Sequence, residues 1–291
     1  MKAISLALGG GGAKGLAHIG AIKSLLQQKV RIHSVAGTSI GSVIASMYAK
    51  GYSPDEMADL FRQVDQNHLF SVPFSDGPGF LGYRGVREFL DKVLGDITFD
   101  QLHIPCCVVS VDLVSDSVIE ITEGSVRDAV LASIAIPGIF PPQYVGEMVL
   151  VDGAVMDPVP VRSARKLGNG LPVAAVVLSG KYRLSQLSPV PMRNGKLNAI
   201  LADQFARTSL SKTFKVLTDA IETSSRQVSE LRLQLDQPDI IIRPAIEEIG
   251  ILDVVDVDAV MKKGLDAANE EYELYIKKQS PIRLWFEKLF R

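Results

Sequence analysis

A serine flanked by glycines, Gly37-Thr38-Ser39-Ile40-Gly41, is the clearest candidate for chemistry in this chain. This G-x-S-x-G spacing lies between a short apolar run and a helical pattern. In that context a serine can sit on a tight strand-to-helix turn that exposes its hydroxyl as a nucleophile. Glycine and serine are common enough for the motif to arise by chance, so its value depends on finding a base and an oxyanion hole elsewhere.

A glycine loop, GGGGAKG, occupies residues 9–15 between the apolar run Ala3–Leu8 and a helical pattern. A loop in this position presents backbone N–H groups to negative charge. A dinucleotide site would also need an acidic residue about 20 positions on, and this chain has no Asp or Glu before Asp55. A phosphate-binding P-loop would need Ser or Thr after Lys14, where Gly15 stands.

An oxyanion hole is therefore the favoured function for the glycine loop, because its N–H groups can stabilise the charge on a tetrahedral intermediate. That function requires a nucleophile close by. Ser39 follows the next short strand, and in a parallel sheet the two strands would end side by side. We expect the loop and Ser39 to be neighbours.

The base for the serine is less obvious, because the histidines are His18, His33, His68 and His103, and none follows. The Ser-Asp/Glu-His order of α/β-hydrolases would need His68 or His103, and neither lies in a convincing setting. A single adjacent base can also activate a serine. Asp152 is the candidate, because it directly follows the apolar strand Met148–Val151 and precedes a glycine; the alternative is an ordinary turn aspartate.

Composition narrows the class of protein. The 291 residues are 47% hydrophobic, and 33 acidic against 31 basic residues leave a formal net charge of -2. The absence of a basic block argues against nucleic-acid binding, and no apolar run is long enough for a transmembrane helix. The only cysteines, Cys106 and Cys107, are neighbours and cannot close a loop, which favours a reduced, cytoplasmic setting.

Short apolar strands alternate with helical patterns, which predicts an α/β fold with a mostly parallel central sheet flanked by helices. We expect strands at 3–8, 34–36, 105–113, 117–121, 148–151, 173–178 and 240–242, and helices at 12–28, 39–50, from 54 and at 196–235. Residues 66–85 predict a loop or lid. Its aromatic residues, Phe70, Phe74, Phe80 and Tyr83, could line an acyl groove or anchor the loop in the core.

Four motifs, in this order, resemble the patatin-like phospholipase family. They are Gly10–Gly15, Gly37–Gly41, the block Ala132–Pro137 with Phe140-Pro141-Pro142, and Asp152-Gly153-Ala154. The segment Asp239–Pro244 and the last helices resemble the bacterial branch related to neuropathy target esterase catalytic domains. The resemblance implies a three-layer α/β hydrolase domain over residues 1–280.

For the site, the resemblance implies Ser39 as nucleophile, Asp152 as general base, and no metal or cofactor. It places the oxyanion hole at the N–H groups of Gly10, Gly11 and Gly12. Lys14 would orient the loop or attract an anionic head group. Supporting positions are Gly15 in the loop and Gly37 and Gly41 at the elbow.

The implied substrate is an acyl ester, a phospholipid or lysophospholipid. The alternative is a regulatory or interaction module of the same fold with a vestigial acyl site, which the intact motifs argue against.

The C-terminal residues 281–291 form a separate amphipathic pattern. Ile282, Trp285, Phe286 and Leu289 fall at helical spacing, with charged residues opposite. Such a helix can lie at a membrane interface, or it can pack on its own domain or another subunit. We therefore expect a cytoplasmic protein with a candidate peripheral membrane contact, and an oligomeric state that the sequence leaves open.

Overall fold

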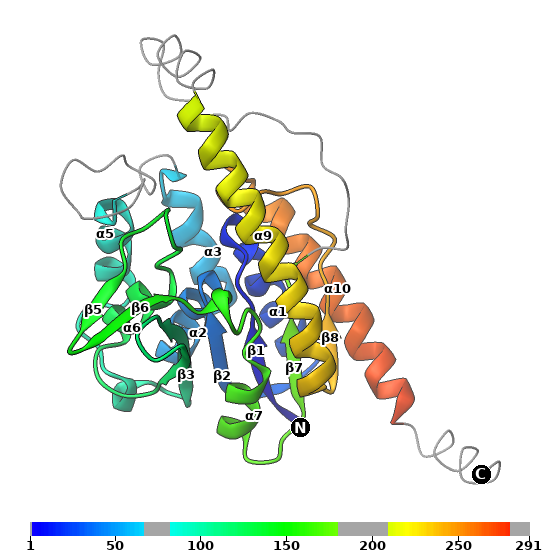
Figure 1. The fold of residues 1–291 in the computed structure, drawn as a ribbon. Helices are drawn as coiled ribbons and strands as arrows, with labels where there is room; N and C mark the ends of the chain where they lie inside the picture. Colours follow the sequence, from blue (N-terminus) through cyan, green and yellow to red (C-terminus); the bar gives the residue numbers. More distant parts are fainter. Residues whose placement is uncertain (1, 67–81, 180–208, 280–291) are drawn as a thin grey trace.

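The structure, a computed structural model, describes residues 2–66, 82–179 and 209–279 (Figure 1). These residues contain one mixed sheet with strands in the order β5-β6-β3-β2-β1-β7-β8. Strands β2 and β6 share one edge of β3, and β4 pairs with its opposite edge. The strands are β1 (Ala3–Leu8), β2 (Arg31–Thr38), β3 (Cys106–Asp112), β4 (Ser117–Ile121), β5 (Gln143–Val145), β6 (Met148–Asp152), β7 (Val173–Val176) and β8 (Ile240–Ile242).

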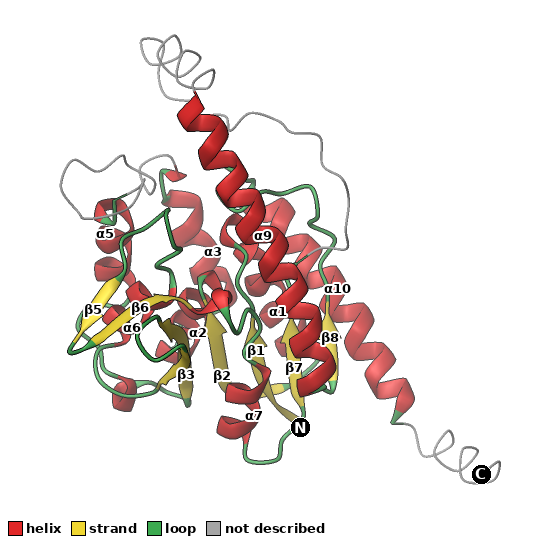
Figure 2. Ribbon diagram, in the orientation of Figure 1, coloured by secondary structure: helices red, strands yellow, loops and turns green. Residues whose placement is uncertain are grey.

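Helices surround this sheet on both faces (Figure 2). They are α1 (Leu16–Gln27), α2 (Ile40–Lys50), α3 (Pro54–Gln63), α5 (Arg84–Val93), α6 (Val126–Ser133), α7 (Val161–Gly168), α9 (Ser209–Asp236) and α10 (Val257–Lys278), with short 3-10 turns η1 (Gly12–Gly15), η2 (Phe99–Gln101) and η3 (Gly153–Val155). The five strands β3, β2, β1, β7 and β8 are mutually parallel. The prediction of a mostly parallel sheet flanked by helices is confirmed.

Successive residues of the central strands point to opposite faces of the sheet, as the two-residue period of a strand requires. On β1, Leu6 and Leu8 enter the larger core and Ala7 the smaller one. The adjacent cysteines divide in the same way, Cys106 to the larger core and Cys107 to the smaller. Small residues on the second face allow α7 to approach closely: a Cβ on Gly168 would lie 1.9 Å from Ser5 Oγ.

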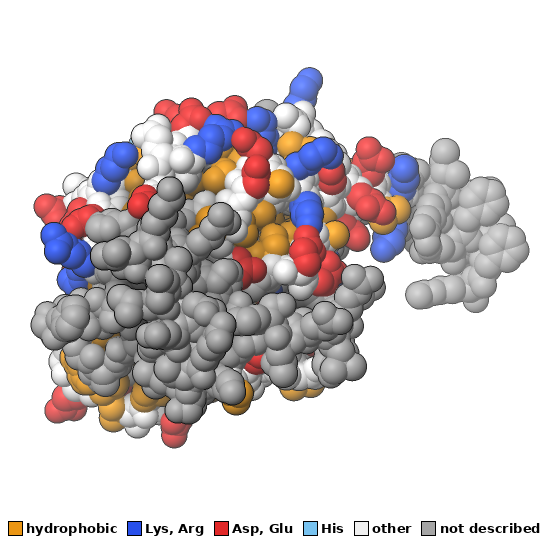
Figure 3. All heavy atoms as spheres, turned by 90° about the horizontal axis from the view of Figure 1, so that it is seen from above, with side chains coloured by type: hydrophobic (Ala, Val, Ile, Leu, Met, Phe, Trp, Pro, Cys, Tyr) orange, Lys and Arg blue, Asp and Glu red, His pale blue; other side chains and the backbone are white. Residues whose placement is uncertain are grey.

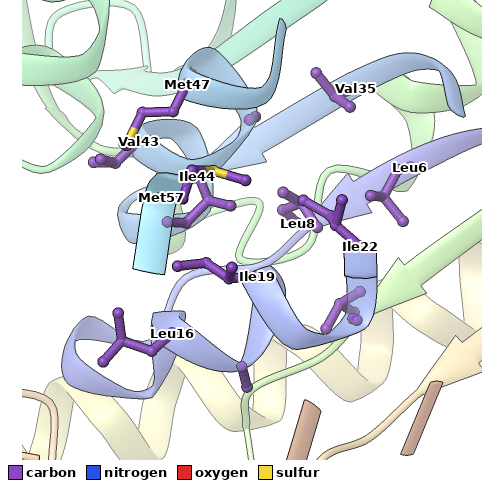
Figure 4. Close-up of a cluster of buried hydrophobic side chains, with 14 of the residues drawn as sticks. Leu6, Leu8, Leu16, Ile19, Ile22, Val35, Val43, Ile44, Met47 and Met57 are labelled. Carbon is purple, nitrogen blue, oxygen red and sulfur yellow. The ribbon is translucent and has the colours of Figure 1, made fainter. Parts of the chain in front are cut away.

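The larger core joins β1 to helices α1, α2 and α3 (Figure 4). Leu8 of β1, Ile19 of α1 and Ile44 of α2 are buried in it. Full burial of such a side chain contributes about 1.5–3 kcal/mol, so this cluster fixes the two helices that follow the glycine loop and Ser39.

Most predicted strands are confirmed, and β2 is longer than expected. The expected helix over 12–28 is wrong at its start, because Gly12 has φ 57° and η1 precedes α1. The expected loop over 66–85 is wrong at its end, where Arg84 begins the strongly amphipathic helix α5. Tyr83 is buried and stacks on Phe140 at 5.2 Å between ring centroids, so it anchors the core.

Other expectations concern residues that the structure does not describe. They include Phe70, Phe74 and Phe80 of the predicted lid, residues 196–208 of the predicted helix that contains α9, and the tail 281–291. Among the described helices, none combines the length and the apolar character that crossing a membrane requires.

Candidate active site

Ser39 occupies a strained turn between β2 and α2. Its backbone has φ 55° and ψ -128°, an uncommon conformation for a residue with a Cβ. The flanking glycines make the turn possible: a Cβ on Gly37 would lie 2.3 Å from the Gly41 carbonyl oxygen, and one on Gly41 would lie 2.1 Å from that of Leu8. The predicted elbow glycines are therefore required by close backbone contacts.

The sheet brings Asp152 to Ser39 along one edge of β3. Thr38, at the end of β2, pairs with Val109, and Asp152, at the end of β6, pairs with Ser110. Strand β4 occupies the opposite edge, so β2 and β6 share the remaining one and meet end to end. Residues 113 positions apart in sequence thereby come into contact.

The two side chains form a direct hydrogen bond. Ser39 Oγ donates to Asp152 Oδ2 at 2.6 Å, and Asp152 Oδ1 accepts from the Ala154 N–H at 2.8 Å. The exposed fractions are 5% for Ser39 and 2% for Asp152. Burial raises the pKa of Asp152 to about 7, and the hydrogen bonds from Ser39 and Ala154 limit the rise. A carboxylate with this pKa is suited to accept a proton near neutral pH.

Ser133 supports the Ser39 turn, a contact that sequence reasoning did not identify. Its Oγ accepts from the Ser39 N–H at 2.9 Å and donates to the Val109 carbonyl at 2.6 Å. Ser133 thus ties the end of α6 to β3 and to the elbow. The Ala132–Pro137 motif marked this segment as characteristic but did not indicate its task.

The glycine loop lies against Ser39, as expected. A Cβ on Gly10 would lie 3.3 Å from Ser39 Cβ. The Gly10 N–H, however, donates to the Pro158 carbonyl at 2.9 Å. Among the described residues no acceptor is found for the N–H groups of Gly11 and Gly12. Of the three loop N–H groups predicted for an oxyanion hole, those of Gly11 and Gly12 therefore have no described acceptor, and that of Gly10 is engaged elsewhere.

His18 holds the base of this loop from α1. Its Nε2 lies 2.7 Å from the Gly9 carbonyl oxygen, and the side chain is fully buried. Burial lowers the pKa of His18 to about 4, so the neutral ring donates to Gly9 at physiological pH. This contact gives His18 a structural role in the glycine loop.

Two cavities meet at Ser39. The first, of about 290 Å³, is lined by the glycine loop, Lys14, Asp152, Ala154 and by residues of α9 that include Glu222 and Ser225. The second, of about 140 Å³, is almost entirely apolar and is bounded by α2, α3 and α5, with Val43, Phe61, Phe89 and Phe140 in its wall. No histidine lines either cavity within the described part of the chain.

Lys14 lies inside the first cavity and is paired with Glu222 of α9.

The described residues contain no group of three His, Cys, Asp or Glu side chains placed to hold a metal ion. The chemistry available at Ser39 is that of a hydroxyl, a buried carboxylate and backbone N–H donors.

These features define an α/β protein with a site of the serine-hydrolase type. Residues 6–165 match the patatin-like phospholipase family, and the chain belongs to that family. The resemblance inferred from the four motifs is confirmed.

Curated relatives point to the neuropathy target esterase branch. An uncharacterised NTE family protein of Mycobacterium tuberculosis (strain ATCC 25618 / H37Rv) is 33% identical over 179 residues, which are 61% of this chain and 49% of that protein. A second from the same strain is 28% identical over 275 residues, 92% of this chain and 46% of its own length. The chain thus spans about half the length of these relatives.

The lysophospholipase NTE1 of Saccharomyces cerevisiae (strain ATCC 204508 / S288c) is 28% identical over 284 residues, covering 91% of this chain and 16% of that protein. Among solved structures, VipD from Legionella pneumophila superimposes with a TM-score of 0.52 at 14% identity, covering 95% of this chain and 67% of that one. This last similarity concerns the fold alone.

Proposed function

We propose that this protein is a serine acyl hydrolase that cleaves lipid acyl esters through Ser39 and Asp152. The observation that carries the proposal is the 2.6 Å hydrogen bond from Ser39 Oγ to the buried Asp152 carboxylate, beside a loop with two available N–H donors. Membership of a family of phospholipases supports the reaction class.

The reaction proceeds in two acyl-transfer steps. Asp152 takes the proton of Ser39 as Oγ attacks the ester carbonyl, and the N–H groups of Gly11 and Gly12 stabilise the oxyanion. The C–O bond to the alcohol then breaks, and Asp152 returns its proton to the leaving oxygen. Water, deprotonated by Asp152, attacks the acyl-enzyme, and collapse of the second intermediate releases the fatty acid and restores Ser39.

The two cavities suggest how an ester is oriented at Ser39. The apolar cavity suits the acyl chain, because each buried CH₂ contributes about 0.8 kcal/mol. The larger cavity, which holds Lys14 and Glu222, suits the alcohol part. The apolar cavity would hold one acyl chain, and the yeast relative is named a lysophospholipase. We therefore favour lysophospholipids over diacyl phospholipids.

A fluorophosphonate probe together with a soluble acyl ester tests the proposal. Wild-type protein should be labelled, and Ser39→Ala should lose labelling and turnover. Asp152→Asn should lower turnover by roughly 10³-fold or more, since removing a catalytic carboxylate has effects of that order. Asp100→Asn, at an exposed aspartate of η2, is the matched control and should retain activity.

Two outcomes would contradict the proposal. Near-native turnover in Asp152→Asn, with loss of activity in His68→Ala or His103→Ala, would replace the dyad with a histidine mechanism. Absence of labelling in the folded wild-type protein would favour a regulatory module with a vestigial acyl site. A panel of phospholipids, lysophospholipids and short esters with the same acyl chain then ranks the substrates.

A further inference from the structure

The Lys14–Glu222 ion pair lies inside the cavity assigned to the alcohol part of the substrate. Its two side chains differ in depth: 4% of the Lys14 side chain is exposed, against 29% of the Glu222 side chain. An incoming ligand therefore meets the Glu222 carboxylate more readily than the ammonium group behind it.

The described lining of this cavity holds one cation and two carboxyl groups. Lys14 is the cation, and Glu222 and Asp152 are the carboxyl groups; the remaining lining side chains are neutral. Burial raises the pKa of Asp152 to about 7, so near neutral pH the cavity carries no net positive charge. A buried cation alone would favour an anion, but a pairing carboxylate cancels that attraction.

The position of Glu222 is fixed by the attachment of α9, which crosses the sheet obliquely (Figure 1). Arg232 Nε donates to the Met156 carbonyl at 3.0 Å, next to η3, and Arg162 Nε donates to Asp236 Oδ1 at 2.6 Å. Leu233 is buried in the smaller core. These contacts hold the C-terminal half of α9 and carry Glu222 to the cavity as part of a continuous helix.

Charged side chains of both signs lie on the described part of the face that Figure 3 shows. Seen from above the orientation of Figure 1, the described Lys and Arg side chains are interspersed with Asp and Glu (Figure 3). The charges that the described residues place next to Ser39 are therefore those of the cavity lining.

We propose that Glu222 is a specificity-determining residue that neutralises Lys14 and selects against esters with a net negative head group. This inference rests on the proposed function, since it concerns the alcohol side of the ester cleaved at Ser39. The structure thereby favours one of the two roles expected for Lys14: it orients the loop within an ion pair and is not free to attract an anion.

The test compares three lipids that share one acyl chain: lysophosphatidylcholine, which is zwitterionic, lysophosphatidylglycerol, which is anionic, and an uncharged monoacylglycerol. All are used below their aggregation thresholds. Wild-type protein should have a lower kcat/KM for the anionic lipid than for the zwitterionic one. In Glu222→Gln the anionic-to-zwitterionic ratio should rise about tenfold or more, mainly through KM, because hydrogen bonds to a charged group are strong.

Glu230→Gln is the matched control: it removes the same charge from the same helix and breaks the ion pair with Arg243, but Glu230 does not line the cavity. Its ratio should equal that of wild type. In the double variant Lys14→Met/Glu222→Gln, the anionic-to-zwitterionic ratio should return to that of wild type, because the ammonium group freed by Glu222→Gln is the source of the rise. Thermal unfolding of each variant checks that the fold is kept.

A ratio that does not change in folded Glu222→Gln, or that changes equally in Glu230→Gln, overturns the inference. If Glu222→Gln does not fold, wild-type protein still decides: a preference for the anionic lipid over the zwitterionic one overturns it. Failure of the proposed function looks different, because the wild-type protein would then hydrolyse none of the three lipids.

Discussion

The two cavities at Ser39 share a rim and differ in the elements and side chains beyond it. Gly12, Ser39, Ile136 and Ile251 line both. Beyond this rim, one cavity is formed by the glycine loop, the η3 turn and α9, and its wall combines ionised and hydroxyl side chains with aliphatic ones. The other is bounded by α2, α3 and α5 and is lined mainly by aliphatic and aromatic side chains, with Gln66 and Asp253 also in its wall.

In the proposed function, this difference separates the chemistry from the binding of the acyl chain. Proton transfer and charge stabilisation need fixed polar groups, which only a rigid turn and a donor-rich loop can position. Binding an aliphatic chain needs apolar area, and it does not require precisely oriented groups, because the hydrophobic effect is non-directional. Because the two tasks use different walls, substitutions in one cavity should leave the other largely intact.

Among substitutions that probe the two cavities, the largest effect should come from the shared rim. Gly12→Ala would place a Cβ 2.0 Å from the Ile251 carbonyl oxygen, at a backbone φ of +57° that disfavours side chains. The loop must move, and loss of an oxyanion donor lowers kcat by roughly 10²–10³-fold. Gly146→Ala is the matched control, because its backbone φ of +59° is similar and a Cβ there would meet nothing within 4 Å. Single-turnover kinetics should show a much smaller loss, and equal losses would remove Gly12 from the site.

A substitution confined to the apolar cavity should change chain-length preference. Val43→Phe, on α2, fills part of that cavity. Long-chain esters should lose about 10–100-fold in kcat/KM, since each excluded CH₂ contributes about 0.8 kcal/mol, while acetate esters change little. A series of p-nitrophenyl esters measures this. Ala220→Phe, in the wall of the other cavity, is the counterpart and should not alter the chain-length profile; if it does, the division between the cavities fails.

The pH dependence of activity should report on the first cavity, which contains Asp152. Since burial raises the pKa of Asp152 to about 7, kcat/KM for a neutral ester should fall about tenfold for each pH unit below that value and level off above it. Titration of Asp152 changes the stability of the fold in the direction opposite to its effect on activity. A carboxyl group with a raised folded-state pKa stabilises the fold most at low pH and loses this contribution as pH rises toward 7.

Asp152→Asn removes this titration. Its gain in Tm over wild type should therefore be larger at pH 8 than at pH 5. The gain should be roughly 2–4 °C for each kcal/mol by which the ionised Asp152 destabilises the wild-type fold. Calorimetry at the two pH values checks the sign. An equal gain at both would show that Asp152 titrates near its ordinary value.

The smallest effect should come from the support of the elbow. Ser133→Ala leaves the buried Ser39 N–H without its acceptor, which costs about 1–3 kcal/mol in the free energy of unfolding. We expect a several-fold lower kcat, because the Ser39 turn is less well held. Ser163→Ala, which removes a buried hydroxyl from α7 on the other face of the sheet, should lower stability without that loss. Denaturant titration with parallel activity assays separates the two.

The local parts of the site were predictable because backbone geometry demands particular residues there. The positive φ of Ser39 and the close contacts of Gly37 and Gly41 restrict the elbow to a narrow set of sequences. The apolar runs likewise predicted β1, β3 and β6, because each strand lies in the buried sheet. The start of α5 was missed, because the aromatic and glycine-rich segment before it resembled one continuous loop.

The contacts that join distant segments were not predictable in the same way. The sequence by itself determined the nucleophile candidate, the glycine loop and the aspartate at a strand end, because each depends on its immediate neighbours. Only the tertiary structure decided that β2 and β6 meet on one edge of β3, that Pro158 occupies the Gly10 N–H, and that Glu222 covers Lys14. Each of these depends on which segments the folded sheet brings together, and no local pattern encodes that pairing.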